Sequence, residues 1–370
     1  MDVSLGGGLG FALDSTGTPG FSFRSTAGTS GLYYGYQSGG SWTSELIEAG
    51  SQTGTGSSLV YDGLTSHIIY GSGSTDLQLN YVTGGPGSWS TPTTIADTEY
   101  PRNNDLGLDA DGNPAAAWVD GGTGIVGYAY HDGTEWKTAE NVASDPRDLS
   151  GVALLLPDSA EEAGLFYSDE SGGWQGIPTY MQRDSGGNWT ADSGAGLSGF
   201  EDVAWMSGTL NGDGNPAMAY MDMFTGDLVY AVWDGAAWST ETVEDLPAPS
   251  GLPDRNYVDI ATDDWGNVHL LYYNPDADQV EYRYRHSGGG WADSLTIHEQ
   301  ANASWMRLSI DDSQKPWFSY YSDVDGEGSV YYGQGTAVPE PATTALFALG
   351  LLSAIGLKRR TSNTSSRGQS

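Results

Sequence analysis

Short apolar runs alternate with polar turns through the first 336 residues of the chain. Runs such as 115–119 (Ala-Ala-Ala-Trp-Val) and 126–130 (Val-Gly-Tyr-Ala-Tyr) have the composition of β-strands, and each is followed by an Asp/Gly turn. A helical spacing of apolar residues appears nowhere before residue 342. Glycine is abundant, with 54 residues, and so are the aromatic residues. The pattern predicts an all-β chain with many short strands.

The strand pattern repeats along the chain. Each unit reads apolar-Asp-x-x-Gly-x-Pro, an aromatic strand, a polar turn, a Tyr-rich strand and Asp-Gly-x-x-Trp. The Trp anchors stand at positions 42, 89, 136, 189, 238 and 291, and the Asp anchors at 14, 62, 109, 158, 213, 263 and 311. Successive Trp anchors are 47–53 residues apart. A unit of this length with four short strands is typical of a propeller blade.

We therefore predict a seven-bladed β-propeller of four-stranded blades over residues 1–336, with an incomplete last blade. The repeats are expected near 1–50, 51–97, 98–145, 146–198, 199–245, 246–300 and 301–336. The unit resembles the sialidase-like or BNR-type propeller repeats of secreted bacterial proteins. It departs from them in lacking the Ser-x-Asp-x-Gly-x-Thr-Trp spacing of their Asp box.

The seventh unit has its Asp anchor but no Trp anchor. Val338 and Pro339 stand where that Trp is expected, 27 or 28 residues after Asp311. Counting back from Asp14 by the 20 residues that separate Trp and Asp anchors in three repeats places the missing Trp upstream of Met1. Propellers avoid a free edge by closing the ring with strands from both ends. The sequence is therefore interpreted as N-terminally incomplete.

A different pattern begins at residue 337. It consists of Pro339, Glu340 and Pro341, an apolar stretch of 16 residues at 342–357, and the basic residues Lys358, Arg359 and Arg360. This order resembles a PEP-CTERM sorting signal over 337–360, with a generic tail anchor as the alternative. A single hydrophobic helix is predicted for the apolar stretch, slightly shorter than the roughly 20 residues that span a bilayer comfortably. Residues 361–370 are expected to form a disordered tail.

The resemblance to PEP-CTERM signals implies a cell type and a processing partner. The partner is an exosortase-type enzyme, and the cell is a Gram-negative bacterium. The implied route crosses the inner membrane and ends at the cell surface or in the extracellular matrix, with cleavage near the two prolines. The segment from Met1 to Gly7 has neither the basic start nor the apolar stretch of a signal peptide, which is a second reason to expect a missing upstream segment.

Charge and composition exclude several function classes. The formal net charge is −34, and such a surface repels phosphate backbones, so we expect no nucleic-acid partner. The chain has no cysteine, which rules out disulfides and thiolate metal sites. Its five histidines show no metal-ligand spacing, and no sequence motif of a catalytic nucleophile is present. We assign no catalytic residues from the sequence.

Acidic turns at one position of the repeat offer a candidate Ca²⁺ site. Asp109 and Asp111 stand in one such turn, and Asp213 in another. Carboxylate and amide oxygens are the ligands that Ca²⁺ prefers. The favoured interpretation is a hairpin turn, because Asp-Gly and Gly-Asn suit the positive φ angles that such turns need.

A second set of polar residues precedes the innermost strands, where propeller loops surround the central channel. Its members are Arg102, Arg147, Arg255, Arg307, Glu201 and Tyr257. The resemblance to sialidases implies that an arginine set could bind a carboxylate, with Tyr, Glu and Asp residues for chemistry. The alternative is structural pairing of these arginines with neighbouring carboxylates, namely Asp105, Asp148, Asp202 and Asp259.

Two hypotheses for function follow. The first is a non-enzymatic surface or matrix propeller that binds an extracellular polysaccharide. The second is a glycan-active enzyme, either a sialidase-like hydrolase or a lyase, that uses the arginines of the channel rim. Guanidinium groups buried against neighbouring carboxylates would favour the first hypothesis, and arginines clustered around an open channel would favour the second.

Overall fold

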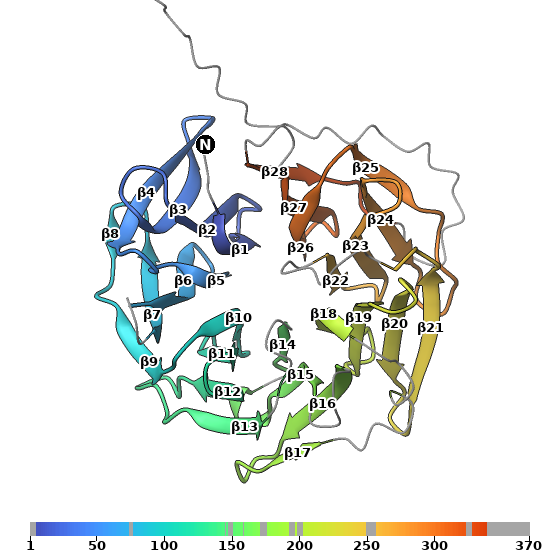
Figure 1. Ribbon diagram of the computed structural model, residues 1–370, viewed down its shortest axis with the longest axis horizontal. Coiled ribbons are helices and arrows are strands. Elements are labelled where there is room, and N and C mark those ends of the chain that lie inside the picture. Colours follow the sequence, from blue (N-terminus) through green and yellow to red (C-terminus); the bar gives the residue numbers. More distant parts are fainter. Residues whose placement is uncertain are drawn as a thin grey trace, which may run out of the picture.

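The computed structural model describes residues 5–73, 77–144, 146, 151–157, 159–170, 176–191, 197, 203–248, 257–322 and 328–338. Its strands form seven antiparallel sheets arranged as a ring around a central axis (Figure 1). The chain is thus a seven-bladed β-propeller, as the repeat predicts. The predicted C-terminal helix lies outside the described residues, and none of the helices within them is long and apolar enough to span a membrane.

Blades 1 to 3 contain the first thirteen strands. Blade 1 consists of β1 (Leu5–Leu13), β2 (Pro19–Ser25), β3 (Gly31–Ser38) and β4 (Ser41–Ala49). Blade 2 consists of β5 (Thr55–Asp62), β6 (Thr65–Ser72), β7 (Gln78–Gly85), β8 (Ser88–Trp89) and β9 (Thr93–Asp97), the last two both pairing with β7. Blade 3 consists of β10 (Pro101–Leu108), β11 (Pro114–Asp120), β12 (Ile125–Tyr130) and β13 (Glu140–Ser144).

Blades 4 to 7 contain the remaining strands. Blade 4 consists of β14 (Val152–Leu155), the 3-10 helix η1 (Ala160–Glu162), β15 (Gly164–Asp169), β16 (Ile177–Arg183) and β17 (Trp189–Ala191). Blade 5 consists of β18 (Val203–Leu210), β19 (Pro216–Asp222), β20 (Leu228–Trp233) and β21 (Trp238–Glu244). Blade 6 consists of β22 (Val258–Thr262), β23 (Val268–Asn274), β24 (Gln279–Arg285) and β25 (Leu295–Glu299). Blade 7 consists of β26 (Ala303–Ile310), β27 (Pro316–Ser322) and β28 (Ser329–Gln334).

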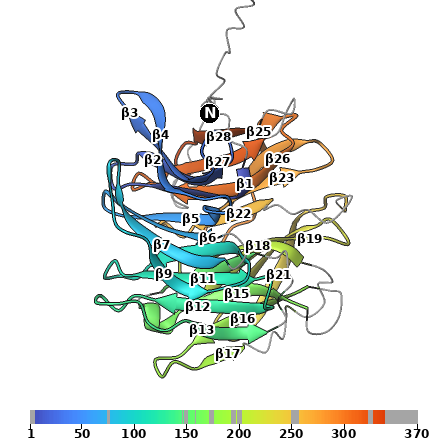
Figure 2. The same ribbon diagram turned by 60° about the vertical axis from the view of Figure 1, so that its left-hand side comes forward.

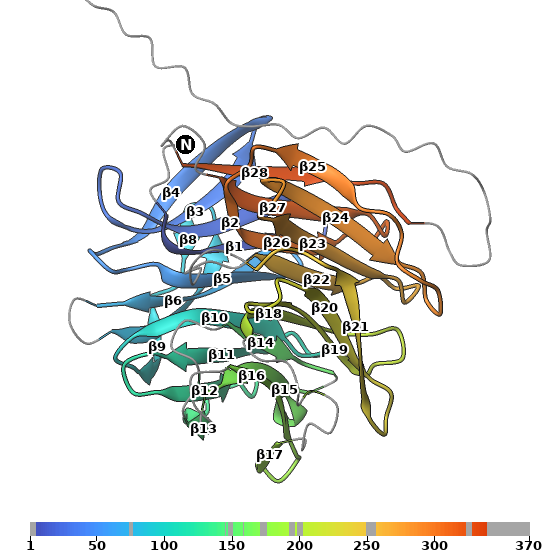
Figure 3. The same cartoon turned by 45° about the vertical axis from the view of Figure 1, so that its right-hand side comes forward.

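The hydrophobic core is divided among the seven interfaces between blades. Each of its seven clusters joins residues of two neighbouring sheets. The turned views show why, because the sheets lie face to face around the ring (Figures 2 and 3). Side chains of both faces of a sheet are therefore buried, which explains near-continuous apolar strands such as β11, whose seven residues are all buried.

The repeating Trp anchors lock each blade onto the blade before it. In six interfaces the indole of one blade contacts, edge to face, a tyrosine on the third strand of the preceding blade. The pairs are Tyr34–Trp89, Tyr81–Trp136, Tyr128–Trp189, Tyr180–Trp238, Tyr230–Trp291 and Tyr332–Trp42, with ring centroids 5.0–5.8 Å apart and planes at 66–77°. Such pairs contribute about 0.5–1.5 kcal/mol each beyond burial. The last pair closes the ring between blades 7 and 1.

Blade 7 has three strands within the described residues, in agreement with the predicted incomplete last blade. Its β28 forms the outer edge of the sheet. Tyr282 of blade 6 occupies the position that receives a tryptophan in the other interfaces. Its hydroxyl lies 2.6 Å from Nδ1 of His269, as the Tyr81 hydroxyl lies 2.6 Å from Nδ1 of His67.

Candidate functional site at the channel mouth

The first strands of all seven blades surround a cavity of about 240 Å³ on the propeller axis. The pairing of first and second strands is irregular at the same place in five blades. The irregular steps are Leu5/Leu9, Thr55/Ser58, Arg102/Asp105, Val203/Met206 and Ser304/Arg307. A bulge of this kind bends a strand and re-aims its side chains. The bulged ends of the inner strands thus form the wall of one mouth of the channel.

One bulge position differs sharply between the two halves of the ring. It lies five residues before the last residue ahead of the first hairpin turn of each blade, as Trp305 lies five residues before Ile310 in blade 7. From blade 1 to blade 7 its occupants are Gly8, Gly56, Asn103, Gly151, Trp205, Tyr257 and Trp305. Blades 1–4 therefore have small residues at this position, and blades 5–7 have aromatic ones, of which Trp205 and Trp305 line the cavity. We call Trp205 and Trp305 the aromatic wall.

Trp305 of the aromatic wall has an unusual backbone conformation. Its φ angle is +58°, in the left-handed region that bulky residues avoid. The equivalent Gly8 and Gly56 have φ angles of +88° and +61°, which glycine adopts without strain. A non-glycine residue held there costs on the order of 1–3 kcal/mol. The ring of Trp305 meets Trp205 edge to face, with centroids 6.1 Å apart.

Three charged side chains line the same cavity two residues further along their strands. Arg307 comes from blade 7, Asp259 from blade 6 and Asp105 from blade 3. Burial raises the pKa of Asp105 to about 6 and also raises the pKa of Asp259, while the positive charge of Arg307 acts in the opposite direction on both. A carboxyl with a pKa near 6 exchanges its proton close to neutral pH.

The two carboxylates also tie neighbouring blades together. Asp105 accepts a hydrogen bond from the Leu154 backbone N–H of blade 4 at 2.7 Å. Asp259 accepts one from the Leu308 N–H of blade 7 at 2.6 Å, and another from the Ser207 hydroxyl. The same carboxylate position therefore bridges inner strands at two interfaces, which gives both residues a structural role.

Arg307 has most of its hydrogen-bonding capacity free. Its Nη1 donates to the Met306 carbonyl at 3.1 Å. Within the described ranges, none of the ion pairs includes Arg307. Arg307 and Asp259 line the same cavity, and the charge of Arg307 acts to lower the pKa of Asp259. The carboxylate oxygens of Asp259 accept hydrogen bonds from Ser207, Leu308 and Ile260, and pairing with Arg307 stays a prediction. A guanidinium has five N–H donors, so Arg307 can bind a further acceptor in the cavity.

The remaining residues predicted for this rim have different outcomes. Arg147, Arg255 and Glu201, the carboxylates of Asp148 and Asp202, and the side chain of Arg102 lie outside the described residues. Tyr257 stacks on Tyr273, with ring centroids 5.5 Å apart and planes at 26°, and it packs against the core between blades 5 and 6. Sequence reasoning missed Trp205 and Trp305, although both stand at the same repeat position as Tyr257.

The acidic turns singled out for Ca²⁺ are the hairpin turns between first and second strands. Oδ1 of Asp109 accepts hydrogen bonds from the N–H groups of Asp111 and Asn113 at 3.0 and 2.8 Å. The equivalent Asn211 accepts from Asp213 N–H at 3.0 Å. No group of three His, Asp or Glu side chains suited to a metal ion occurs in the part of the chain that the structure describes. The cation hypothesis stays a prediction.

Comparisons with solved structures show the propeller fold. An ulvan lyase, a polysaccharide lyase bound to -[GlcA(1-4)Rha3S]-, is similar at 12% identity with a TM-score of 0.56, covering 89% of this chain and 94% of its own. The six-bladed fucose-recognising lectin of Aleuria aurantia is similar at 15% identity and a TM-score of 0.51, over 76% and 93%. AofleA of Arthrobotrys oligospora is similar at 13% identity and a TM-score of 0.51, over 80% and 87%. At such identities the likeness shows the fold alone.

The C-terminal pattern matches a known motif, whereas no curated protein matches the chain. Residues 337–360 match the PEP-CTERM protein-sorting motif, which contains Pro339, Glu340, Pro341 and the basic residues from Lys358 to Arg360. From Pro339 onward these residues lie outside the described part of the structure. The chain therefore combines a seven-bladed β-propeller with a PEP-CTERM sorting motif that marks it for export and exosortase-type processing.

Proposed function

We propose that this protein is an exported glycan-binding propeller that binds polysaccharide at the channel mouth. The observation that carries the proposal is the free guanidinium of Arg307, which shares one cavity with the aromatic residues Trp205 and Trp305. Carbohydrates bind where flat aromatic rings cover their C–H faces and fixed polar groups bond their hydroxyl or carboxylate oxygens. The fold likeness to a fucose lectin and to a polysaccharide lyase supports a glycan ligand.

The unevenness of the mouth supports a ligand role more than a packing role. The fold is built at blades 1 and 2 with glycine at the bulge position, so a large ring is not needed to form the bulge. Trp305 nevertheless keeps its ring there against a backbone strain. Strained residues of this kind cluster at ligand sites, where the surrounding structure holds them in place.

A glycan array probed with the purified full chain and two variants tests the proposal. Arg307→Gln keeps a polar side chain but removes the charge. Trp305→Gly removes the ring and installs the residue that blades 1 and 2 have at this position, which relieves the strain. Both variants are expected to keep the fold by circular dichroism and to bind polysaccharide at least about tenfold more weakly. Unchanged binding in both variants would reject the channel mouth as the site.

The second candidate function is a glycan-active enzyme at the same place. It is favoured by the Asp105 carboxyl, whose pKa of about 6 suits a general acid or base, in one cavity with Arg307. Arg102, Arg147 and Arg255 are the further candidates for holding an acidic sugar, in a sialidase-like or lyase arrangement. Incubation of the chain with polyuronates and sialosides, followed by assays for new reducing ends and unsaturated uronates, tests this function. Turnover that Asp105→Asn abolishes would support an enzyme, whereas binding without turnover supports the lectin-like role.

The destination of the protein is proposed from its sorting motif. We infer transit across the inner membrane of a Gram-negative cell, cleavage near Pro339–Pro341, and release to the surface or the extracellular matrix. Mass spectrometry of the protein recovered from the cell surface tests this route. The expected result is a C-terminus close to residue 340. Recovery of an intact peptide from Glu340 to Arg360 at the surface would contradict processing.

A further inference from the structure

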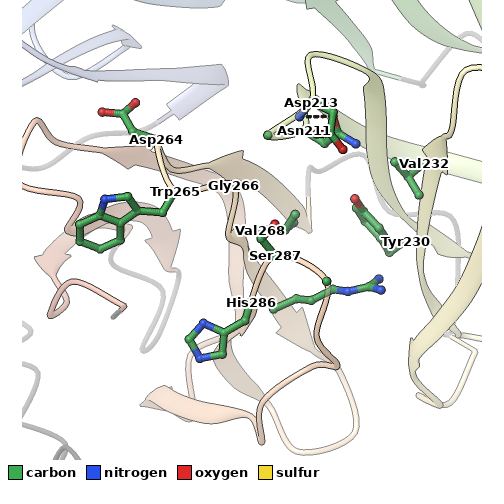
Figure 4. A pocket seen from close by; sticks show the side chains of 13 residues that line it. Asn211, Asp213, Tyr230, Val232, Asp264, Trp265, Gly266, Val268, His286 and Ser287 are labelled. Carbon is green, nitrogen blue, oxygen red and sulfur yellow. Dashed lines mark hydrogen bonds between the residues drawn. The ribbon is translucent and has the colours of Figure 1, made fainter. Parts of the chain in front are cut away.

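A second cavity lies between blades 5 and 6, away from the channel. It has a volume of about 270 Å³ and opens between the first hairpin turns of the two blades (Figure 4). Its walls come from the turn at Asn211 and Asp213, from Tyr230 on β20, and from the segment between Arg285 and Gly288. Gly212 and Gly266 bring the two hairpin turns together, since a Cβ on Gly212 would lie 2.7 Å from the Gly266 Cα.

Tyr230 presents an unused hydroxyl to this cavity. The residue is only 4% exposed, and its hydroxyl has no hydrogen-bond partner within the described parts of the chain. Figure 4 shows the oxygen pointing away from β20 toward the gap between Asn211 and Val268. Burial raises the pKa of Tyr230 to about 12, so the group remains a neutral hydroxyl that can donate and accept. The hydroxyl oxygen is open to the cavity, so a ligand can bond it without displacing a protein partner.

The equivalent interface between blades 3 and 4 explains why this cavity is open. There the hydroxyl of Tyr128 donates to the carbonyl of Ala160 in η1, which fills the space. The η1 segment also covers Arg183, whose Nη1 donates to the Glu161 carbonyl at 2.6 Å. Blade 6 has a short hairpin turn at the place of η1, and among the described residues no backbone group bonds the Tyr230 hydroxyl. The open cavity is therefore not a property of every interface. A larger cavity of about 480 Å³ lies between blades 4 and 5, where Tyr180 forms part of the wall.

The side chains around Tyr230 hold it in a fixed position. Trp291 meets its ring edge to face at 5.5 Å, and the guanidinium of Arg285 lies 5.7 Å from the ring centroid. Arg285 is itself held by an ion pair with Glu241 and by a hydrogen bond to the Gly289 carbonyl at 2.7 Å. A preorganised group loses little conformational entropy when a ligand binds.

The chemistry of the walls indicates the class of ligand. A volume of about 270 Å³ is just below the range of pockets for drug-sized molecules, so one ring-sized group fits. The Oδ1 atom of Asn211 is engaged by its own hairpin turn, which leaves the amide NH₂ as a donor. The exposed carboxylate of Asp213 stands at the rim and repels anions. The carboxylate of Asp264 points away from the cavity (Figure 4) and accepts a hydrogen bond from Nε2 of Gln314 at 2.8 Å. The walls thus offer neutral donors and acceptors inside a negative rim.

We propose that the cavity between blades 5 and 6 binds one neutral sugar residue of a polysaccharide, with the Tyr230 hydroxyl as its central hydrogen-bonding group. The site is separate from the channel mouth and selects a different chemistry, since the mouth offers the free cation of Arg307. Two sites of different character on one propeller would let the protein hold neutral and acidic parts of a matrix at once.

Saturation-transfer NMR on the full chain tests the site with methyl glycosides of neutral hexoses, of N-acetylhexosamine and of glucuronic acid as probes. At least one neutral glycoside is expected to bind, and the glucuronide is expected to bind more weakly. Tyr230→Phe removes only the hydroxyl and should weaken binding at least about fivefold. Ser287→Tyr, at an exposed rim position, should fill the cavity and abolish binding.

Tyr128→Phe is the matched control, because it removes the hydroxyl at the equivalent position of blade 3, where the protein itself supplies the partner. It should leave binding of the neutral glycoside unchanged. Binding that survives both Tyr230→Phe and Ser287→Tyr, preference for the glucuronide, or no neutral glycoside bound would each overturn the inference. Loss of binding only in Arg307→Gln would place the ligand in the channel, which would leave the proposed function standing and reject this second site.

Discussion

The indole N–H groups of the Trp anchors provide a matched test of how blades are held together. Trp189 donates its N–H to Oε2 of Glu140 in the preceding blade at 2.7 Å. Trp42 stands at the equivalent position of blade 1 with the same edge-to-face contact, but its indole nitrogen is buried without a partner in the described structure. Replacing each by phenylalanine removes the N–H at both sites, together with similar parts of the ring.

The magnitude follows from the difference between the two sites. A hydrogen bond to a charged group contributes about 1.5–3 kcal/mol, and Glu140 keeps its ion pair with Arg183 after the substitution, so we expect a loss near the lower end for Trp189→Phe. Removing an unsatisfied buried donor in Trp42→Phe relieves a penalty of about 1–3 kcal/mol. Trp189→Phe should therefore be less stable than Trp42→Phe by about 2.5–4.5 kcal/mol.

Urea denaturation at neutral pH, followed by near-ultraviolet circular dichroism, measures the difference as a shift in midpoint at equal slope. Trp89→Phe extends the test, because Trp89 donates its N–H to Glu45 and should behave like Trp189. Equal losses for all three variants would refute the reasoning, since they would show that the ring contact alone holds the blades together. A greater loss in Trp42→Phe would show that ring closure is energetically special.

Three further predictions concern the carboxylates. The folded-state pKa of Asp105, about 6, lies above the roughly 3.9 of an unfolded aspartate. The contribution of Asp105 to the free energy of unfolding is therefore fully present below about pH 4 and is lost as the pH rises through 6. Asp105→Asn should therefore gain stability relative to the parent as the pH is raised from about 4.5 to 7.5 in urea titrations, and a flat difference would contradict the pKa. Asp120 is 3% exposed and accepts hydrogen bonds from the N–H groups of Glu99 and Tyr100 at 3.0 and 2.8 Å, so Asp120→Ala should cost about 3 kcal/mol or more in the same assay. Because the Asp109 carboxylate is engaged by its own hairpin turn, EDTA and added Ca²⁺ should leave the melting temperature unchanged. A higher melting temperature in the presence of Ca²⁺ would support the cation hypothesis.

Much of the fold could be predicted from two residue types. A tryptophan at a spacing of 47–53 residues indicates the blade length, because each blade needs one anchor against its neighbour. Four of the Asp anchors mark first hairpin turns because the side chain accepts N–H groups two and four residues later, as Asp14 does with Thr16 and Thr18. In blade 5 the accepting residue is Asn211, two residues before the anchor Asp213. Both signals are local in the sequence, so they survive without knowledge of the tertiary structure.

The tyrosines that receive the tryptophans are harder to find. Tyr34 and Trp89 are 55 residues apart, and only the closed ring brings the last pair, Tyr332 and Trp42, together. The cavity at Tyr230 shows the same limit. It depends on a short hairpin turn in the next blade, and the sequence of β20 gives no sign of whether a neighbour fills the space above its tyrosine.

The channel mouth shows how a repeat can hide a site. Arginines and acids drew attention to the stretch before the inner strands, yet the contrast at the bulge position appears only when the seven blades are aligned on their bulges. Glycine and asparagine suit a bulge with positive φ, so their presence in blades 1–3 has a backbone reason. The backbone conformation does not explain Trp305, because a bulky residue is disfavoured at a positive φ angle. A residue that opposes the local preference in one repeat, while the other repeats obey it, is where selection for binding is expected to appear.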